Sequence, residues 1–192
     1  MIVLGALSII AVYIFAERYS AIRRAQKVDI NFMNQIKEYI HEDKIDAAKA
    51  LCNSHNTPVA RMILKGIERI GRPLADVNTA IENVGNLEVS KLESGLPTLA
   101  TIAGGSPMLG FLGTVIGLIQ AFYEMSKAGN SIEMGLLSGG IYTAMVTTVG
   151  GLFVGIFAYF GYNILVAKVE KVVFTMEHNT IEFMDLLNEP VE

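Results

Sequence analysis

Three long stretches of this sequence contain no charged residue, and they limit what the chain can fold into. They are residues 1–16, 95–123 and 134–167, and 52% of the whole chain is hydrophobic. An α-helix needs about 20 apolar residues to cross the hydrocarbon core of a bilayer, which is about 30 Å thick. The second and third stretches exceed that length, and soluble domains rarely contain such runs. The pattern predicts an integral membrane protein made of α-helices.

The first charge-free stretch has 16 residues, or roughly 24 Å of helix. It could be the hydrophobic part of a signal peptide, but no basic segment precedes it and no small-residue cleavage site follows it. We interpret it as a first span that begins abruptly because the N-terminus is short or trimmed. The predicted transmembrane helices are residues 1–16, 96–123 and 135–167, and the third should tilt or protrude from the bilayer.

Lysine and arginine are distributed unevenly along the chain. Residues 17–97 hold 12 of the 15, two more follow the third stretch, and only Lys127 lies in the loop 124–134. Because basic residues remain on the cytoplasmic side, the segments 17–95 and 168–192 are predicted to be cytoplasmic and the N-terminus and the loop 124–134 periplasmic. A basic cluster after the first span should contact anionic lipid headgroups: Arg18, Arg23, Arg24 and Lys27.

The predicted cytoplasmic segment has the spacing of helices. Apolar residues recur every three or four positions over 59–70 and 77–87, and Gly71 and Pro73 separate these groups. Another helical stretch follows Asp29 and breaks at 53–58. Apolar residues at the same spacing also continue after the third span to about Asn188. The predicted fold class is all-α, with three transmembrane helices and long cytoplasmic helical extensions.

The sequence contains no motif for catalysis or for cofactor binding. The glycine pairs at 104–105 and 150–151 are not followed by the Gly-Lys-Ser/Thr of a phosphate-binding loop. No Ser/His/Asp arrangement is present, Cys52 is the only cysteine, and the three histidines lie far apart. We therefore predict a protein that is not an enzyme and that binds no cofactor, metal or nucleic acid.

Small residues gather on one face of the second span. At about 100° per residue, that face carries Ala103, Ser106, Gly110, Gly113, Thr114, Gly117 and Ala121. Such faces let helices approach each other closely in lipid. Pro107 lies inside the same span, where it removes a backbone hydrogen bond and should kink the helix. We predict that this face packs against another helix.

The third span has its own row of small residues, four positions apart: Gly135, Gly139, Thr143, Thr147, Gly151 and Gly155. Thr148 lies beside this row. The threonine hydroxyls could bond to carbonyls of their own helix, or face water, an ion or a partner's ionisable group, and both alternatives stay open. We assign helix packing to Gly110, Gly113, Gly117, Gly151, Gly155 and Pro107, and a pore or proton pathway to Thr114, Thr143, Thr147 and Thr148.

No Asp, Glu, Lys, Arg or His lies within any predicted span. Proton relays in membranes use titratable groups at depth. If this chain conducts protons, a partner must therefore supply the carboxylate.

These segments resemble the MotA/TolQ/ExbB proton-channel family, and its ExbB branch more than its TolQ branch. The resemblance covers essentially the whole chain and is carried by Gly-Leu-Pro-Thr-Leu-Ala-Thr-Ile-Ala at 95–103, Ser-Pro-Met-Leu-Gly-Phe-Leu-Gly-Thr-Val-Ile-Gly at 106–117 and Gly-Gly-Ile-Tyr-Thr-Ala-Met-Val-Thr-Thr-Val-Gly-Gly-Leu at 139–152. It implies a homo-oligomer, a pentamer, around a central pore. A dimer of ExbD- or TolR-like single-span partners would bring an aspartate to that pore, beside Thr114 and Thr148. Many ExbB proteins have a glutamate where this chain has Thr143, which leaves the partner's aspartate as the titrating group.

The same resemblance implies a function. The chain would be a proton-channel or stator subunit of an inner-membrane motor that couples the proton motive force to TonB-dependent transport across the outer membrane. The alternatives are a TolQ-type subunit of the Tol–Pal envelope system, acting with a TolA-like protein, and a purely structural membrane scaffold. A secondary transporter is disfavoured, because three spans give no inverted repeat and no internal charge. Whether the ion is a proton or sodium stays open.

Overall fold

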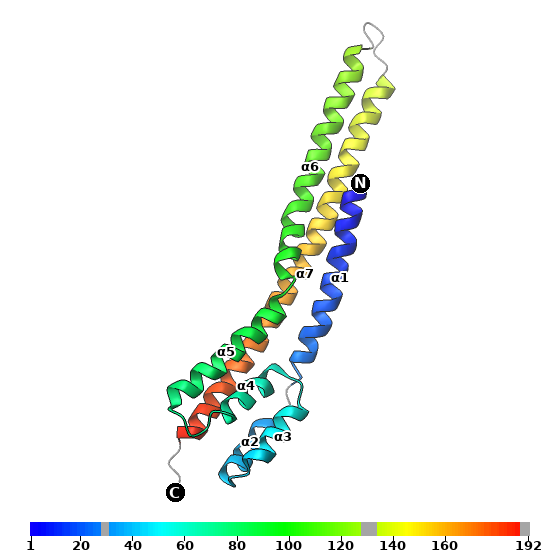
Figure 1. The fold of residues 1–192 in the computed structure, drawn as a ribbon. Coiled ribbons are helices and arrows are strands. Elements are labelled where there is room, and N and C mark those ends of the chain that lie inside the picture. Colours follow the sequence, from blue (N-terminus) through cyan, green and yellow to red (C-terminus); the bar gives the residue numbers. More distant parts are fainter. Residues whose placement is uncertain (28–30, 128–133, 189–192) are drawn as a thin grey trace. The chain divides into compact units, whose positions relative to one another are not determined.

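The computed structural model describes residues 1–27, 31–127 and 134–188, and every regular element in them is an α-helix (Figure 1). The all-helical prediction is confirmed. The seven helices of these residues are α1 (Ile2–Ala25), α2 (Phe32–His41), α3 (Ile45–Ser54), α4 (Pro58–Ile67), α5 (Leu74–Glu93), α6 (Leu96–Lys127) and α7 (Met134–Asn188). Most of the predicted loop 124–134 and the last four residues of the predicted C-terminal helix, 189–192, lie outside the described residues.

The chain divides into two compact units. One, here called the apolar unit, comprises Met1–Glu17 and Gly95–Leu165. The other, here called the charged unit, comprises Arg18–Ser94 and Val166–Glu192. Helices α1 and α7 contribute to both units, because each continues past the end of its charge-free stretch.

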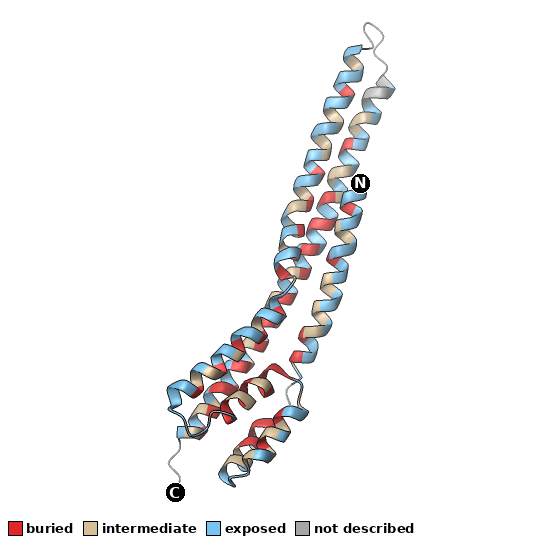
Figure 2. Ribbon diagram, in the orientation of Figure 1, coloured by how far each residue is buried: buried red, intermediate tan, exposed pale blue. Residues whose placement is uncertain are grey.

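Three helical segments are long and apolar enough, by length and composition, to cross a bilayer: Ile2–Ala25, Leu74–Lys127 and Ser138–Asn188. Only 11%, 17% and 28% of the most apolar window in each segment is buried, and Figure 2 shows many exposed positions along α1, α6 and α7. Exposure of so much apolar surface to water is unfavourable, so lipid or a neighbouring chain is expected to cover it. These are the helices of a membrane protein.

Two helix boundaries follow from single residues. Thr57 caps α4, because its hydroxyl accepts a hydrogen bond from the backbone N–H of Ala60 at 3.3 Å, and Pro58 fits the first helical position. Gly95 separates α5 from α6 with a φ of +83°, a conformation that glycine adopts without steric cost. The expected break at 53–58 therefore lies between α3 and α4.

One boundary was not anticipated. The helical stretch that was expected to run from Asp29 to residue 53 consists of two helices, α2 and α3, joined by a turn at 42–44. Asp43 occupies the left-handed region there, with a φ of 56°. Aspartate tolerates this conformation better than most residues, but neither glycine nor proline marks the turn.

The charged unit is built around α4, which packs against α3 and α5. Gly66 of α4 makes the closest approach: a Cβ at this position would lie 2.5 Å from the ring of Phe183 and 2.8 Å from Ile81. Phe183, on α7, and Ile81, on α5, are both fully buried. The last part of α7 therefore belongs to the same core as α4 and α5.

Candidate functional site

Helices α6 and α7 meet through small residues in the apolar unit. A Cβ at Gly151 would lie 2.6 Å from the carbonyl oxygen of Ser106 and 2.8 Å from Cα of Gly110, and a Cβ at Gly110 would lie 3.1 Å from Cα of Gly151. The two backbones are thus in direct contact. Glycine at both positions permits this approach, and any side chain would separate the helices.

The same contact continues in both directions along the two helices. A Cβ at Gly155 would lie 2.6 Å from Cγ of Pro107, and one at Gly117 would lie 2.8 Å from Cβ of Ala144. A Cβ at Gly113 would collide with the methyl group of Thr147. The residues to which sequence analysis assigned packing therefore lie between two helices of one chain. Helix α6 continues through Pro107, whose ring lies over Gly155.

Thr114 and Thr148 face each other within this contact, and their hydroxyl groups hydrogen-bond to each other. The Thr148 hydroxyl also lies 3.1 Å from the carbonyl oxygen of Gly110, and the Thr114 hydroxyl lies 3.3 Å from the carbonyl oxygens of Gly110 and Ala144. Two hydroxyl protons are thus shared among more acceptors than they can serve at once. The hydrogen bonds can therefore rearrange without separation of the helices.

The other two predicted pathway residues have different surroundings. Thr143 is exposed, and its hydroxyl donates to the carbonyl of Gly139 at 2.9 Å. Thr147 is half-buried and donates to the carbonyl of Thr143 at 3.0 Å. Both hydroxyls are therefore bonded within their own helix. The structure brings Thr114 and Thr148 together and leaves Thr143 apart from them.

Ser106 is a further polar group in the α6–α7 contact. It is fully buried, and its hydroxyl has no hydrogen-bond partner among the described residues. Sequence analysis placed Ser106 on the small face without a role of its own. No signal beyond its position on that face could have shown that the hydroxyl is both buried and unpaired.

Beyond the threonine pair, α6 and α7 border an open hollow of about 710 Å³. Glycine and alanine form most of its wall, and its polar side chains are Thr143, Gln120 and Glu124. Glu124 is the acidic residue at which the charge-free stretch of α6 ends. The hollow therefore joins the small-residue faces to the first charged residue beyond them.

The α6–α7 contact offers hydroxyl and carbonyl oxygens but no carboxylate, imidazole or basic side chain. Residues 95–123 and 134–167 contain no Asp, Glu, Lys, Arg or His. Over residues 1–27, 31–127 and 134–188, no group of three His, Cys, Asp or Glu side chains could hold a metal ion. Proton transfer at this site would need an ionisable group from another molecule.

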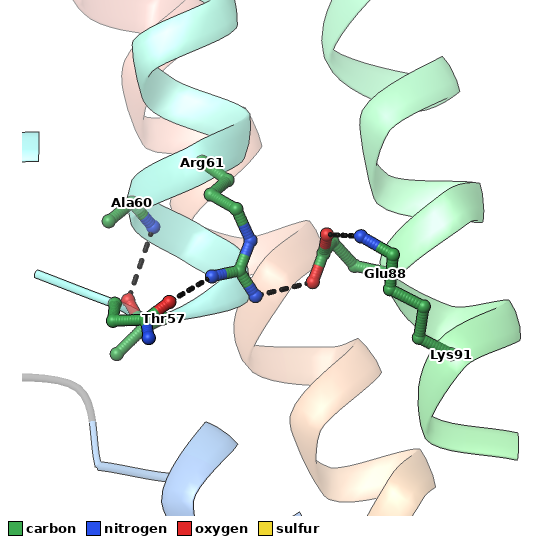
Figure 3. Close-up of polar contacts among 6 residues, drawn as sticks. Thr57, Ala60, Arg61, Glu88 and Lys91 are labelled. Carbon is green, nitrogen blue, oxygen red and sulfur yellow. Dashed lines mark hydrogen bonds and ion pairs between the residues drawn. The ribbon is translucent and has the colours of Figure 1, made fainter. Parts of the chain in front are cut away.

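Sequence analysis did not predict an ion-pair cluster around a buried glutamate in the charged unit (Figure 3). Glu88 of α5 is only 4% exposed, and its carboxylate accepts hydrogen bonds from Arg61 at 2.5 Å and from Lys91 at 2.7 Å. Arg61 also donates to Asn56 at 2.6 Å. Burial raises the pKa of Glu88, but the bonds from Arg61 and Lys91 outweigh it and hold the pKa below its ordinary value.

The spacing of the buried residues on α5 could have revealed this cluster. Glu88 falls at helical intervals from the apolar residues that α5 buries, namely Val77, Ile81 and Leu92. A charged residue on such a face needs a partner, because an isolated buried charge is strongly unfavourable. Its partner Arg61 lies on another helix, however, and the spacing on α5 does not identify it.

Comparison with known proteins gives one family and several relatives. Residues 54–178 match the sequence model of the MotA/TolQ/ExbB proton channel family. A biopolymer transport protein ExbB homolog of Methanothermobacter thermautotrophicus is 30% identical over 172 residues, which are 88% of this chain and 61% of the relative. The Tol-Pal system protein TolQ of Pseudomonas aeruginosa is 26% identical over 202 residues, covering 100% of this chain and 87% of the relative.

Other relatives match over shorter regions. The Tol-Pal system protein TolQ of Haemophilus influenzae is 38% identical over 87 residues, which are 45% of this chain and 38% of the relative. The matches to the ExbB homolog and to this TolQ protein thus span 61% and 38% of their lengths. Both ExbB and TolQ proteins are therefore similar to this chain, at modest identity.

Proposed function

Because this chain belongs to the MotA/TolQ/ExbB proton channel family, we propose that it is the channel subunit of a proton-driven energy transducer in the bacterial inner membrane. In this proposal its copies form a pentamer around a central pore. The N-terminus and the loop 124–134 are periplasmic, and the charged unit is cytoplasmic. The proton motive force would drive TonB-dependent transport across the outer membrane.

One observation carries the proposal: the Thr114–Thr148 pair lies in the stretches 95–123 and 134–167, which contain no Asp, Glu, Lys, Arg or His. Hydroxyl groups can donate to a carboxylate or accept from a carboxylic acid, but they do not take up a proton near neutral pH. The pair is therefore suited to guide a titrating group that another chain provides. An ExbD- or TolR-like single-span partner with an aspartate in its span would provide that group.

The proposed pathway includes Thr143 and Thr147 as well. Thr143 lines the open hollow between α6 and α7, together with Gln120 and Glu124. This position supports a role as an entry for protons from the periplasmic side. Thr147 lies one helical turn further along α7, towards the Thr114–Thr148 pair.

A second candidate is a TolQ-type subunit of a Tol–Pal system, which would act with TolR- and TolA-like proteins. It is supported by the similarity to two Tol-Pal system TolQ proteins, one of which matches along the whole chain. The Thr114–Thr148 pair fits both systems equally well. Pull-down of the chain from native membranes with its single-span partner, and identification of the third component as TonB-like or TolA-like, would decide between the two.

Reconstitution into liposomes tests the channel proposal. Under an imposed potential, the chain alone should conduct protons poorly, and co-reconstitution with its single-span partner should give flux. Replacement of the partner's membrane aspartate by asparagine should abolish that flux. Equal flux from this chain alone would show that no partner carboxylate is needed, and no flux under any condition would favour a structural scaffold.

A further inference from the structure

Two surfaces of the charged unit, on different flanks of α5, differ in the sign of most of the charged residues that line them. We propose that they bind each other between copies of this chain, so that the Leu87 face of one copy docks into the Glu177 groove of the next. The Leu87 face comprises Lys65, Arg69, Val84 and Leu87, and the Glu177 groove comprises Glu82, Val89, Val173, Glu177 and Ile181. This inference rests on the proposed homo-oligomer and identifies a contact between its subunits outside the membrane spans.

The Glu177 groove lies between α5 and α7 and has a volume of about 640 Å³. Apolar side chains from α4, α5 and α7 line it, and Ile181 is 62% exposed at its edge. Its two charged residues, Glu82 and Glu177, are both acidic and exposed. Glu177 has no ion pair or side-chain hydrogen bond to any described residue. The groove is thus an apolar depression with a negative rim, large enough to admit a leucine side chain.

The Leu87 face lies along a smaller hollow of about 440 Å³ between α4 and α5. Leu87 lines this hollow and is 63% exposed, although it lies outside the charge-free stretches. Lys65 and Arg69 line this hollow, with Asp76 as its one acidic residue. Lys65 pairs with Glu68 at 2.8 Å, whereas Arg69 has no ion pair with any described residue. Two of the three charged residues that line the hollow are therefore basic, and Arg69 is the basic one that is available for an acidic partner.

The positions of these residues on α5 allow one copy to use both surfaces at once. Leu87 and Glu82 are five positions apart, which is about 140° around the helix axis at 100° per residue. Contacts between two different surfaces are heterologous, and they form a ring when the rotation between copies closes. Self-pairing of the Glu177 groove would instead bring like charges together, which is unfavourable. Complementarity therefore favours a second copy, bound head to tail.

Disulfide crosslinking between two tagged versions of the full chain tests this contact. One version carries Leu87→Cys and the other carries Ile181→Cys, both in a Cys52→Ala background. The two are co-expressed, and the membranes are oxidised with copper phenanthroline. We expect a disulfide-linked dimer that contains both tags, and no dimer when either version is expressed alone. Leu87→Cys paired with Lys44→Cys is the matched control, because Lys44 is exposed and lies outside both surfaces.

The outcomes separate this inference from the proposed channel. If native mass spectrometry shows an oligomer but the Leu87→Cys and Ile181→Cys versions do not crosslink, the contact is wrong and the channel proposal stands. Strong crosslinking of Ile181→Cys to itself would also overturn the contact, because it indicates self-pairing. A chain that is monomeric in the membrane would overturn both proposals.

Reversal of the charge at Arg69 or Glu177 tests the same contact in a second way, through the yield of the crosslinked mixed dimer. Arg69→Glu and Glu177→Arg should each lower the yield of the mixed dimer about two- to fivefold, as is typical for loss of an exposed ion pair. Introduction of both changes into every copy should restore the yield, because opposite charges then face each other again. Failure of the double variant to recover, when each single variant has lost yield, would contradict a direct contact between these residues.

Discussion

The hydroxyl groups of Thr114 and Thr148 hydrogen-bond to each other across the contact of α6 and α7, although the residues are 34 positions apart. Both lie where glycine brings the two backbones together, and both share the carbonyl of Gly110 as an acceptor. The pair is therefore held by helix packing as well as by its own hydrogen bonds.

Removal of either hydroxyl should impair proton flux. Thr114→Val and Thr148→Val keep the shape of the side chain, so membrane insertion and assembly should persist. A hydrogen bond to a charged group contributes about 1.5–3 kcal/mol, so flux in liposomes with the partner should fall about tenfold or more. Thr101→Val is the matched control, because that hydroxyl is exposed and donates only to Pro97 of its own helix, at 2.9 Å. Wild-type flux in both test variants would exclude the hydroxyls from the mechanism.

A single methyl group at Gly151 should separate α6 from α7. In Gly151→Ala the new Cβ would lie 2.6 Å from a carbonyl oxygen and 2.8 Å from a Cα atom, and neither can move independently of its helix. Such overpacking costs about 1–3 kcal/mol, which should lower the thermal unfolding midpoint of the protein in detergent. Gly104→Ala serves for comparison, because a Cβ there has no neighbour within 4 Å, and its midpoint should not fall. Equal midpoints for both variants would contradict the close helix contact.

The Glu88 cluster should make stability depend on pH. Because the folded-state pKa of Glu88 lies below its ordinary value of 4.5, the stabilisation is present above pH 4.5 and is lost as the pH falls through the folded-state pKa. Glu88→Gln should therefore cost about 1–3 kcal/mol in the free energy of unfolding at pH 7 and progressively less in acid. Denaturant unfolding at several pH values measures this difference. Glu68→Gln is the control: it also removes a pair with a lysine, but an exposed one that should contribute little.

Cys52 should resist alkylation while the protein is folded. The thiol is buried, and burial raises its pKa to about 12, so almost no reactive thiolate exists near neutral pH. Mass spectrometry after incubation with iodoacetamide should find Cys52 unmodified in the native protein and modified in guanidinium chloride. Rapid labelling of the native protein would show that α3 opens readily.

The sequence predicts three long apolar helices, because charged residues are unfavourable in lipid and the charge-free stretches are visible in the sequence itself. The direction of the small face on α6 was also predictable, since helical geometry fixes which residues share a face. Which helix that face contacts was not. Gly110 could have met a neighbouring chain, and only the three-dimensional arrangement shows that it meets Gly151 of the same chain.

Charge patterns were less informative outside the apolar unit. The pairing of Arg61 with Glu88 depends on the packing of α4 against α5, and no local spacing relates two residues 27 positions apart. The turn at Asp43 likewise lacks the glycine or proline that usually marks such a position. The extent of α1 beyond its charge-free stretch was not predicted, since hydropathy reports contact with lipid and not the end of a helix. The continuation of α7 to Asn188 was predicted, because apolar residues keep their helical spacing after the third span.

The surplus of acceptors around Thr114 and Thr148 lets this pair either donate a hydrogen bond to a carboxyl group of another chain or accept one from it. Two hydroxyl protons cannot satisfy both hydroxyl oxygens and the carbonyls of Gly110 and Ala144 simultaneously. A protonated carboxyl can therefore donate a hydrogen bond to the pair, and an ionised carboxylate can accept a hydrogen bond from one of the hydroxyl groups after that group rotates. The pair would then stabilise both protonation states to a similar degree. Neither protonation state of the carboxyl group would then be strongly favoured, which the proposed proton pathway needs if the group is to be protonated and deprotonated in turn.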